Sequence, residues 1–344
     1  MKKILLFLIL PFLGLSQGIN FSTASSLQEA RAEAIKQNKL LFMEIYAPDC
    51  HICNSFKGVF TQPAVGAVYN KNFVNYQLDI RNPANQMVLK QAGIIVNATP
   101  TFVFFEPKSM KIVQARIFGE KENTVTMVNG IGTKAANPAE HATQFPKRLA
   151  AGEKNPGMLI NYAEYARITG DTLSNIKAMN AYIALLTPAQ YSSQSTFNLM
   201  QVALMSHDNR LFDYFIRNLN YYNSLYDPSV VRMIYENIFQ ITLTSSRAAQ
   251  LGDAGISKLK VQMAKTGLDR SSIVRRTWMV ESDMLFKQRK ATQAMKVIDE
   301  LIQSMPSALG PKENQFLCDY VKGKTKDAAA LKKAKSNWCL FGTK

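Results

Sequence analysis

Two cysteines with two residues between them, Cys50 and Cys53, are the side chains of this chain whose spacing best suits chemistry. Such a pair can form a reversible disulfide, and the thiolate of one cysteine is the nucleophile. The pair follows an apolar run at 40–46, which predicts a buried strand, and residues 54–60 can continue as a helix. This order predicts Cys50 at a helix N-terminus, where free N–H groups and the helix dipole favour a thiolate. The pattern therefore indicates thiol-disulfide chemistry.

Four stretches around this motif resemble the thioredoxin family, in the family's order. Residues 41–53 resemble its second core strand and redox motif, and residues 73–80 resemble the next core strand. Residues 82–94 resemble the following helix and its glycine-isoleucine turn, and residues 98–105 resemble the strand that begins with a Thr-Pro motif. The resemblance covers roughly residues 21–119. It implies an α/β thioredoxin-like fold, with a central mixed sheet flanked by helices.

The resemblance also assigns roles to individual side chains. It implies that the peptide bond before Pro100 is cis and faces the dithiol, so that Thr99 and Pro100 line the edge that binds substrate together with His51. It places Glu44 beneath Cys53, the resolving thiol, where the carboxyl can take the proton that this thiol must lose. A carboxyl inside an apolar strand is costly unless it has a function, and the alternative is an exposed strand face.

Two positions depart from the family's pattern. Asp49 stands where the family has tryptophan before the first cysteine, and the motif interior is His-Ile rather than Gly-Pro. A cationic His51 would stabilise a Cys50 thiolate and favour an oxidant, whereas Asp49 would oppose it. The sequence leaves open whether the protein is an oxidant, a reductant or an isomerase, because the fold hosts all three.

The first 17 residues have the layout of a secretory signal peptide, with Lys2 and Lys3 before a 12-residue apolar run at 4–15. That run is shorter than a membrane span needs. We therefore expect an exported, soluble protein of the bacterial periplasm, without stable membrane insertion. A chain of 344 residues, 47% of them hydrophobic, can build two domains around apolar cores.

Glycine, proline and asparagine accumulate between residues 130 and 157, and strand-like runs are scarce afterwards. This predicts a thioredoxin-like domain at 18–137 and an α-helical domain at 138–344. The helical pattern suggests pairs at 159–168 with 173–186, 197–205 with 211–222, and 278–286 with 291–302, and single helices at 230–249 and 256–264.

These pairs resemble degenerate tetratricopeptide-like repeats, because small or polar turns join the helices and a proline follows the second one at Pro188, Pro228 and Pro306. A generic helical domain is the alternative. A repeat array would offer a concave surface for a peptide or protein. The region's aromatic residues, such as Tyr222 and Tyr226, fall at helical spacing, which predicts packing between helices, and a groove would need several of them exposed together.

The net charge of +16 raises the question of nucleic acid. The basic residues are spread along the chain and we expect export, so we expect no nucleic-acid partner. The lysine-rich C-terminal stretch, residues 322–335, is interpreted as a solvated helix face that could also attract an anionic partner.

The remaining cysteines, Cys318 and Cys339, are expected to bond to each other in an exported protein and to stabilise the C-terminal stretch by roughly 3 kcal/mol. One alternative is electron exchange with the first pair, and another is a zinc site made by all four cysteines. Only one pair has ligand spacing, so we expect no metal and no cofactor. His141 and His207 have no partner pattern and are interpreted as surface or turn residues.

Two functional hypotheses remain. The first is an exported thiol-disulfide oxidoreductase that acts on protein thiols or disulfides, exchanges electrons with a redox partner protein, and uses its helical domain to bind a client or partner. The second is a binding or scaffold protein whose thioredoxin-like module is structural and whose disulfide stays closed. The dithiol, the acidic Glu44 and the Thr99-Pro100 motif occur together, which favours the first hypothesis.

Overall fold

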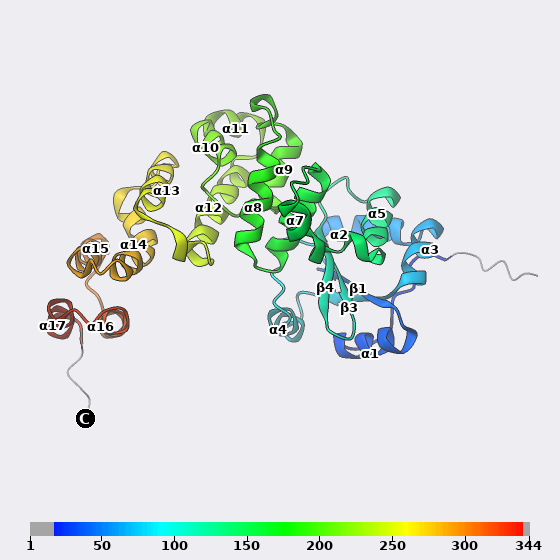
Figure 1. The fold of residues 1–344 in the computed structure, drawn as a ribbon, viewed down its shortest axis with the longest axis horizontal. Helices are drawn as coiled ribbons and strands as arrows, with labels where there is room; N and C mark the ends of the chain where they lie inside the picture. The colour runs from blue at the N-terminus through cyan, green and yellow to red at the C-terminus, as the bar shows by residue number, and fades with distance from the viewer. Residues whose placement is uncertain (1–16, 340–344) are drawn as a thin grey trace, which may run out of the picture. The chain divides into compact units, whose positions relative to one another are not determined.

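The computed structural model describes residues 17–339. The chain divides into two compact units, Met1–Glu153 and Lys154–Lys344, which are described separately (Figure 1). The predicted signal peptide covers residues 1–17. Of these, residues 1–16 lie outside the described residues. Among residues 17–339, no helix has both the length and the apolar composition that crossing a membrane requires.

The N-terminal unit contains a mixed sheet of four strands in the order β2-β1-β3-β4. The strands are β1 (Leu40–Tyr46), β2 (Phe73–Asp79), β3 (Thr101–Glu106) and β4 (Lys111–Ile117). β1 pairs in parallel with β2 and antiparallel with β3, and β3 pairs antiparallel with β4. The three strands predicted from the sequence are therefore present, and the mixed sheet of the predicted fold is confirmed.

Five helices accompany this sheet: α1 (Leu27–Gln37), α2 (His51–Phe60), α3 (Pro63–Asn72), α4 (Pro83–Gln91) and α5 (Val125–Ala136). A core of aromatic residues joins one face of the sheet to α2, α3 and α5. Phe42 of β1 contacts Phe102 and Phe104 of β3, with ring centroids 5.0 and 4.9 Å apart. Phe56 of α2 contacts Phe102 at 5.8 Å. These large buried rings anchor α2, and with it the motif at its start, to the sheet.

The first unit extends to Glu153, beyond the predicted boundary near residue 138. The segment after α5 forms two short 3₁₀ turns and α6 (Phe145–Ala150). Gln114 of β4 donates to the carbonyl of Glu140, and Phe145 is fully buried. Arg148 forms ion pairs with Glu140 and Glu153. Glycine and proline mark turns here, but the turns pack on the sheet and do not form a linker.

The second unit is all α-helical in its described residues. Its α-helices are α7 (Pro156–Ile168), α8 (Thr172–Ile183), α9 (Gln194–Val202), α10 (Arg210–Arg217), α11 (Leu219–Leu225), α12 (Pro228–Thr244), α13 (Asp253–Lys265), α14 (Arg270–Lys287), α15 (Ala291–Ser304), α16 (Pro311–Lys324) and α17 (Ala328–Asn337). The predicted helix at 211–222 is two helices, because the backbone breaks at Asn218, whose side chain caps the carbonyl of Tyr214.

Consecutive helices pack as pairs: α7 with α8, α14 with α15, and α16 with α17. The turn after α7 contains Gly170 in the left-handed region, with φ 70°, and Asp171 caps the first turn of α8. α14 also contacts α16, and α15 contacts α17, so that one pair stacks on the next. Stacked helical pairs are the arrangement that repeat arrays use, and the tetratricopeptide-like interpretation stays a prediction.

The aromatic residues of this unit mainly pack between helices, as expected. Tyr222 is fully buried and lies edge-on to Phe215, with ring centroids 4.7 Å apart. Tyr226 stacks on Phe197 at 3.7 Å. Tyr221 and Phe316 are exceptions, with 49% and 50% of their surface exposed.

Candidate active site

The Cys50–Cys53 segment lies where β1 passes into α2. β1 ends at Tyr46, and Cys50 is the N-cap residue of α2. The backbone N–H of Cys50 donates to the carbonyl of Ala47 at 3.1 Å, and the N–H of Cys53 donates to Cys50 Sγ at 3.1 Å. A sulfur therefore takes the position that an oxygen of serine or aspartate takes in most helix caps. Hydrogen-bond donation to this sulfur favours its thiolate.

The two thiols are free and differ in access to solvent. Cys53 is buried, with 5% of its surface exposed, whereas Cys50 is partly exposed. Burial raises the pKa of the Cys53 thiol, and the hydrogen bond with Cys50 raises it further. Burial acts in the same direction on Cys50, but hydrogen bonds from Cys53, the Thr99 side chain and the backbone outweigh it and lower the pKa of Cys50. Cys50 therefore ionises first and is the better nucleophile.

The predicted substrate edge lies against this cysteine. The Thr99–Pro100 peptide bond is cis, as the resemblance implies. The Cys50 thiol donates to the carbonyl of Thr99, with 3.4 Å between sulfur and oxygen. The carbonyl of Pro100 accepts the N–H of Phe118 at 3.1 Å, which ties this loop to the end of β4. The structure thus brings Cys50, Cys53 and Thr99 together.

Glu44 is buried, with 2% of its surface exposed, so the alternative of an exposed strand face is wrong. Burial raises the pKa of this carboxyl to about 7, although a hydrogen bond from Gln77 and the charge of Lys57 act in the opposite direction. The amide Nε2 of Gln77 donates to Glu44 Oε2 at 2.7 Å. Lys57 lies one helical turn after Cys53 on α2, and its effect on Glu44 indicates that the carboxyl lies on the α2 side of the sheet.

Strand alternation supports the same placement. Phe42 and Glu44 are two residues apart on β1 and therefore point to the same face. Phe42 belongs to the core beneath α2 and α3, and the charge of Glu44 also raises the pKa of Tyr69 on α3. The role of Glu44 as the proton acceptor for Cys53 stays a prediction, because its described hydrogen bond is with Gln77.

Two ion pairs at the surface flank the dithiol. The carboxylate of Asp49 pairs with Arg81, which follows β2. His51 Nε2 lies 3.0 Å from Oε1 of Glu120, in the loop after β4. The two side chains that the sequence sets in opposition, at positions 49 and 51, thus each contact a residue that can carry the opposite charge.

Three residues of this site belong to no sequence motif and were not predicted: Gln77, Arg81 and Glu120. Gln77 could have been found by aligning the predicted strands at 40–46 and 73–79 in parallel, because this register places Glu44 opposite Gln77. Arg81 and Glu120 lie in loops, where spacing along the chain gives no indication of distance in space.

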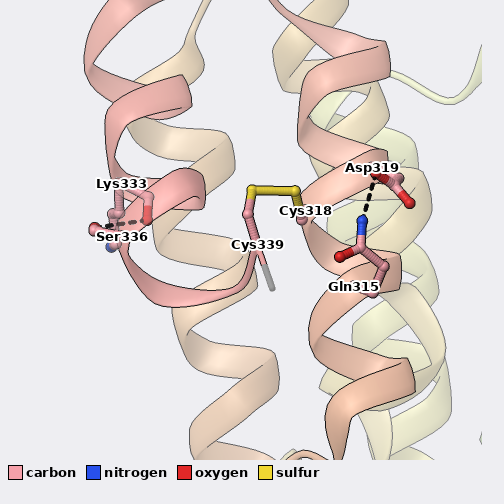
Figure 2. The surroundings of a disulfide bond; sticks show 6 residues. All are labelled: Gln315, Cys318, Asp319, Lys333, Ser336 and Cys339. Atoms are coloured by element: carbon pink, nitrogen blue, oxygen red, sulfur yellow. Dashed lines mark hydrogen bonds between the residues drawn. A yellow bond between two sulfur atoms is a disulfide. The ribbon is translucent and has the colours of Figure 1, made fainter. Parts of the chain in front are cut away.

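The second cysteine pair forms a disulfide between α16 and the residue that follows Trp338, as predicted (Figure 2). Cys318 is fully buried in an apolar cluster that includes Trp338. A zinc site made by all four cysteines is therefore excluded, because these two sulfurs bond to each other. Among residues 17–339, no group of three or more histidine, cysteine, aspartate or glutamate side chains is placed to hold a metal ion.

His207 lies in the turn between α9 and α10, as one of its two interpretations has it, but it is not a surface residue. Its side chain is fully buried between α9 and α10, and burial lowers its pKa to about 4. Apolar residues on both sides along the chain, 203–205 and 211–212, bury this histidine with them. His141 is partly buried, and its Nε2 lies 2.9 Å from the carbonyl of Ala135.

Comparison with known families agrees with this geometry. A family model described as Thioredoxin-like matches residues 23–107, a range that includes β1, α2 and β3 with the motif between them. The N-terminal unit is therefore a thioredoxin-like domain, and an all-α region follows it. No curated protein matches the sequence of this chain.

Proposed function

We propose that this protein is an exported thiol-disulfide oxidoreductase that acts on protein substrates. The observation that carries the proposal is the asymmetry of the two free thiols: Cys50 is partly exposed and its sulfur accepts an N–H, whereas Cys53 is buried with a raised pKa. Enzymes of this chemistry need one thiol that attacks and a second that remains protonated until the intermediate has formed.

In the proposed reaction, the Cys50 thiolate attacks one sulfur of a substrate disulfide, and the other substrate sulfur leaves as a thiolate. Cys53 then transfers its proton to Glu44 and attacks Cys50 Sγ. The Cys50–Cys53 disulfide forms, and the substrate departs with two thiols, so two electrons pass from the protein to the substrate. The same steps in reverse oxidise a substrate dithiol, and a redox partner protein restores the starting state in either direction.

Glu44 is suited to the proton transfer because its pKa, about 7, lies close to neutral pH. A general base is most effective when its pKa is near the pH at which it works. Gln77 holds the carboxyl by a hydrogen bond of 2.7 Å. Thr99, Pro100 and the exposed His51 border Cys50 and would contact the substrate chain on either side of its sulfur.

Export to the periplasm is part of the proposal and rests on the signal-peptide layout of residues 1–17. The disulfide between Cys318 and Cys339 supports it, because structural disulfides persist mainly in oxidising compartments. The helical unit would then bind a client or a partner protein.

The experiment that tests the proposal is a titration of the full protein against glutathione buffers. Thiol alkylation and mass spectrometry would follow the Cys50–Cys53 pair, with Cys50→Ser as the control. We expect a reversible transition that requires Cys50, and its midpoint would give the direction of electron flow. A pair that stays oxidised below about −300 mV would contradict the proposal and favour a scaffold with a structural disulfide.

A further inference from the structure

The second unit contains a groove that none of the preceding roles uses. Its volume is about 540 Å³, within the ~300–1,000 Å³ range of ligand-binding pockets. α14, α15, α16 and the connection between the last two supply its lining: Arg275, Trp278, Leu301, Met305, Leu309, Lys312, Glu313, Phe316 and Leu317. The floor is apolar and the charged side chains are exposed at its edge. An apolar centre with a polar rim is the usual anatomy of a protein interface.

The apolar lining is incompletely covered. Phe316 has 50% of its surface exposed, although its ring lies edge-on to Trp278 at 6.4 Å. Tryptophan and arginine are the residue types that most often dominate binding energy at interfaces, and Trp278 and Arg275 lie one helical turn apart on α14. Met305 adds a flexible side chain that can adapt its shape to a partner.

Some basic side chains of α14, α16 and α17 are paired with carboxylates, namely Arg276, Lys324 and Lys333. Within residues 17–339, neither Arg275 nor Lys312 has a carboxylate at ion-pair distance. The guanidinium of Arg275 is held instead by the carbonyl of Ser304, at 2.6 Å, and the hydroxyl of Ser272, at 3.0 Å, so its position is fixed. Ser272 in turn donates to the carboxylate of Asp269 at 2.9 Å.

The wider surroundings have the same sign. Residues 269–339 contain 14 lysines and arginines and 8 aspartates and glutamates. Glu313 is the only carboxylate among the groove residues, so the lining itself also has a positive balance. A basic surface attracts an acidic partner over several ångströms and suppresses basic ones.

We propose that this groove binds a segment of a partner protein in which a bulky apolar side chain stands next to carboxylates. The apolar side chain would lie against Trp278 and Phe316, and the carboxylates would pair with Arg275 and Lys312. This deepens the proposed function, since it gives the helical unit a binding surface and its partner a chemistry. It does not require the dithiol to react.

A displayed library of random short peptides, selected on the immobilised full chain with Cys50→Ser and Cys53→Ser, tests the proposal without thiol capture. Enriched peptides should combine leucine, phenylalanine or tryptophan with neighbouring aspartate or glutamate. Their affinity for the same full chain would then be measured by fluorescence anisotropy, together with the change in tryptophan emission. Enrichment of basic peptides, or of none, would overturn the proposal.

Matched variants locate the binding. Phe316→Glu should weaken binding of an enriched peptide by at least about tenfold, because it removes an apolar contact and adds a repelling charge. Met279→Ala changes a residue of α14 that is 40% exposed and outside the groove lining, and it should leave the affinity unchanged. Equal loss in both variants, or in neither, would place the binding elsewhere and contradict the proposal.

Charge is tested in the same way. Lys312→Glu should lower affinity by about three- to tenfold and reduce its dependence on salt, whereas Lys296→Glu makes the same change at an exposed position outside the groove. Equal effects would indicate attraction by net charge alone and overturn the pairing with Lys312. Circular dichroism of each variant would show that it is folded.

The glutathione titration separates the two proposals. Peptide binding at the groove with an unreactive Cys50–Cys53 pair would contradict the oxidoreductase and leave the groove proposal supported. A reactive Cys50–Cys53 pair without any enriched peptide would support the oxidoreductase and contradict the groove proposal.

Discussion

The two cysteine pairs of this chain have the same chemistry but different surroundings. Cys50 and Cys53 are free thiols at the start of a helix, where one sulfur accepts a backbone N–H and is open to solvent. Cys318 and Cys339 are bonded to each other, and Cys318 is enclosed by an apolar cluster. The first pair has donors that stabilise a thiolate, and a buried carboxyl, that of Glu44, lies on the preceding strand.

The difference shows that access and hydrogen-bond donors, more than the presence of two cysteines, determine whether a pair is reactive or structural. In the second pair Cys318 is fully buried, whereas Cys339 is only partly buried. A pair at a helix N-terminus can exchange because its exposed sulfur ionises more readily than its buried one.

The largest expected effect comes from removing the attacking sulfur. Cys50→Ser should abolish reduction of a disulfide-bonded model peptide, because the hydroxyl of serine does not ionise near neutral pH. Under the same buffers the Cys318–Cys339 disulfide should stay closed in both proteins, as tryptic mass mapping would show. If that disulfide opens at the same potential as the first pair, the contrast between the two pairs is wrong.

Glu44 should make the stability of the folded protein depend on pH. Because the pKa of its carboxyl rises to about 7 in the folded protein, the folded state holds a proton that the unfolded state loses near pH 4.5. Its contribution to stability is present at low pH and is lost between about pH 4.5 and 7, and amounts to roughly 3 kcal/mol. Urea unfolding at several pH values should show this decline in the wild type and its absence in Glu44→Gln.

Exposed carboxylates provide the control for that measurement. Glu300→Gln changes a side chain that is 48% exposed, and the stability of this variant should decline with pH as in the wild type.

The resolving step should also slow in Glu44→Gln, so that a mixed disulfide with substrate accumulates. A variant that resolves at the wild-type rate at every pH would remove Glu44 from the proposed mechanism.

The second pair should affect stability and leave exchange intact. Replacing both residues, with Cys318→Ala and Cys339→Ser, should lower the free energy of unfolding by roughly 3 kcal/mol, since the bridge closes a loop with a sequence separation of 21. Urea unfolding measures the loss, and the rate of peptide reduction should match the wild type. A fall in that rate would mean that the second pair takes part in electron transfer.

The smallest effect is expected at Gln77. Its hydrogen bond lowers the pKa of Glu44, so Gln77→Ala should move the pH dependence of the resolving step to higher pH, by about one pH unit. The rate at high pH should stay close to that of the wild type, which distinguishes a positioning residue from a general loss of structure. Stopped-flow measurements across pH 6–9 would detect the change, and an unchanged midpoint would show that Gln77 does not tune the carboxyl.

Much of the N-terminal unit was predictable because its signals are local. The apolar run at 40–46, the break before Cys50 and the Thr-Pro motif at 99–100 each identify their own element without reference to distant residues. The pairing of Cys318 with Cys339 was predictable for another reason, because few cysteines leave few partners. Two of the three predicted helical pairs, α7 with α8 and α14 with α15, followed from apolar spacing and turn residues, as the Gly170 turn shows. The predicted pairing of 197–205 with 211–222 is not among the closely packed helix pairs.

The rest depends on distances in space. Gln77 reaches Glu44 through strand register, and Glu120 reaches His51 through a loop, so neither contact has a sequence pattern. The helix breaks at Asn218, whose own side chain caps the carbonyl of Tyr214. The helical spacing of apolar residues in the sequence continues across this position, so it does not reveal the break. The groove around Trp278 arises from three helices whose apolar residues individually predict nothing more than a core.

The position of Cys339 has a consequence for how the chain is made. Synthesis and export from the N-terminus present the cysteines in the order 50, 53, 318 and 339, so three thiols are present before Cys339, the native partner of Cys318, arrives. In an oxidising compartment, where an oxidant accepts the two electrons, Cys318 could during that interval form a disulfide with either thiol of the first pair. Correct pairing then depends on the folding of the N-terminal unit before α16 emerges, because folding buries Cys53 and leaves one sulfur in place of two as a competitor.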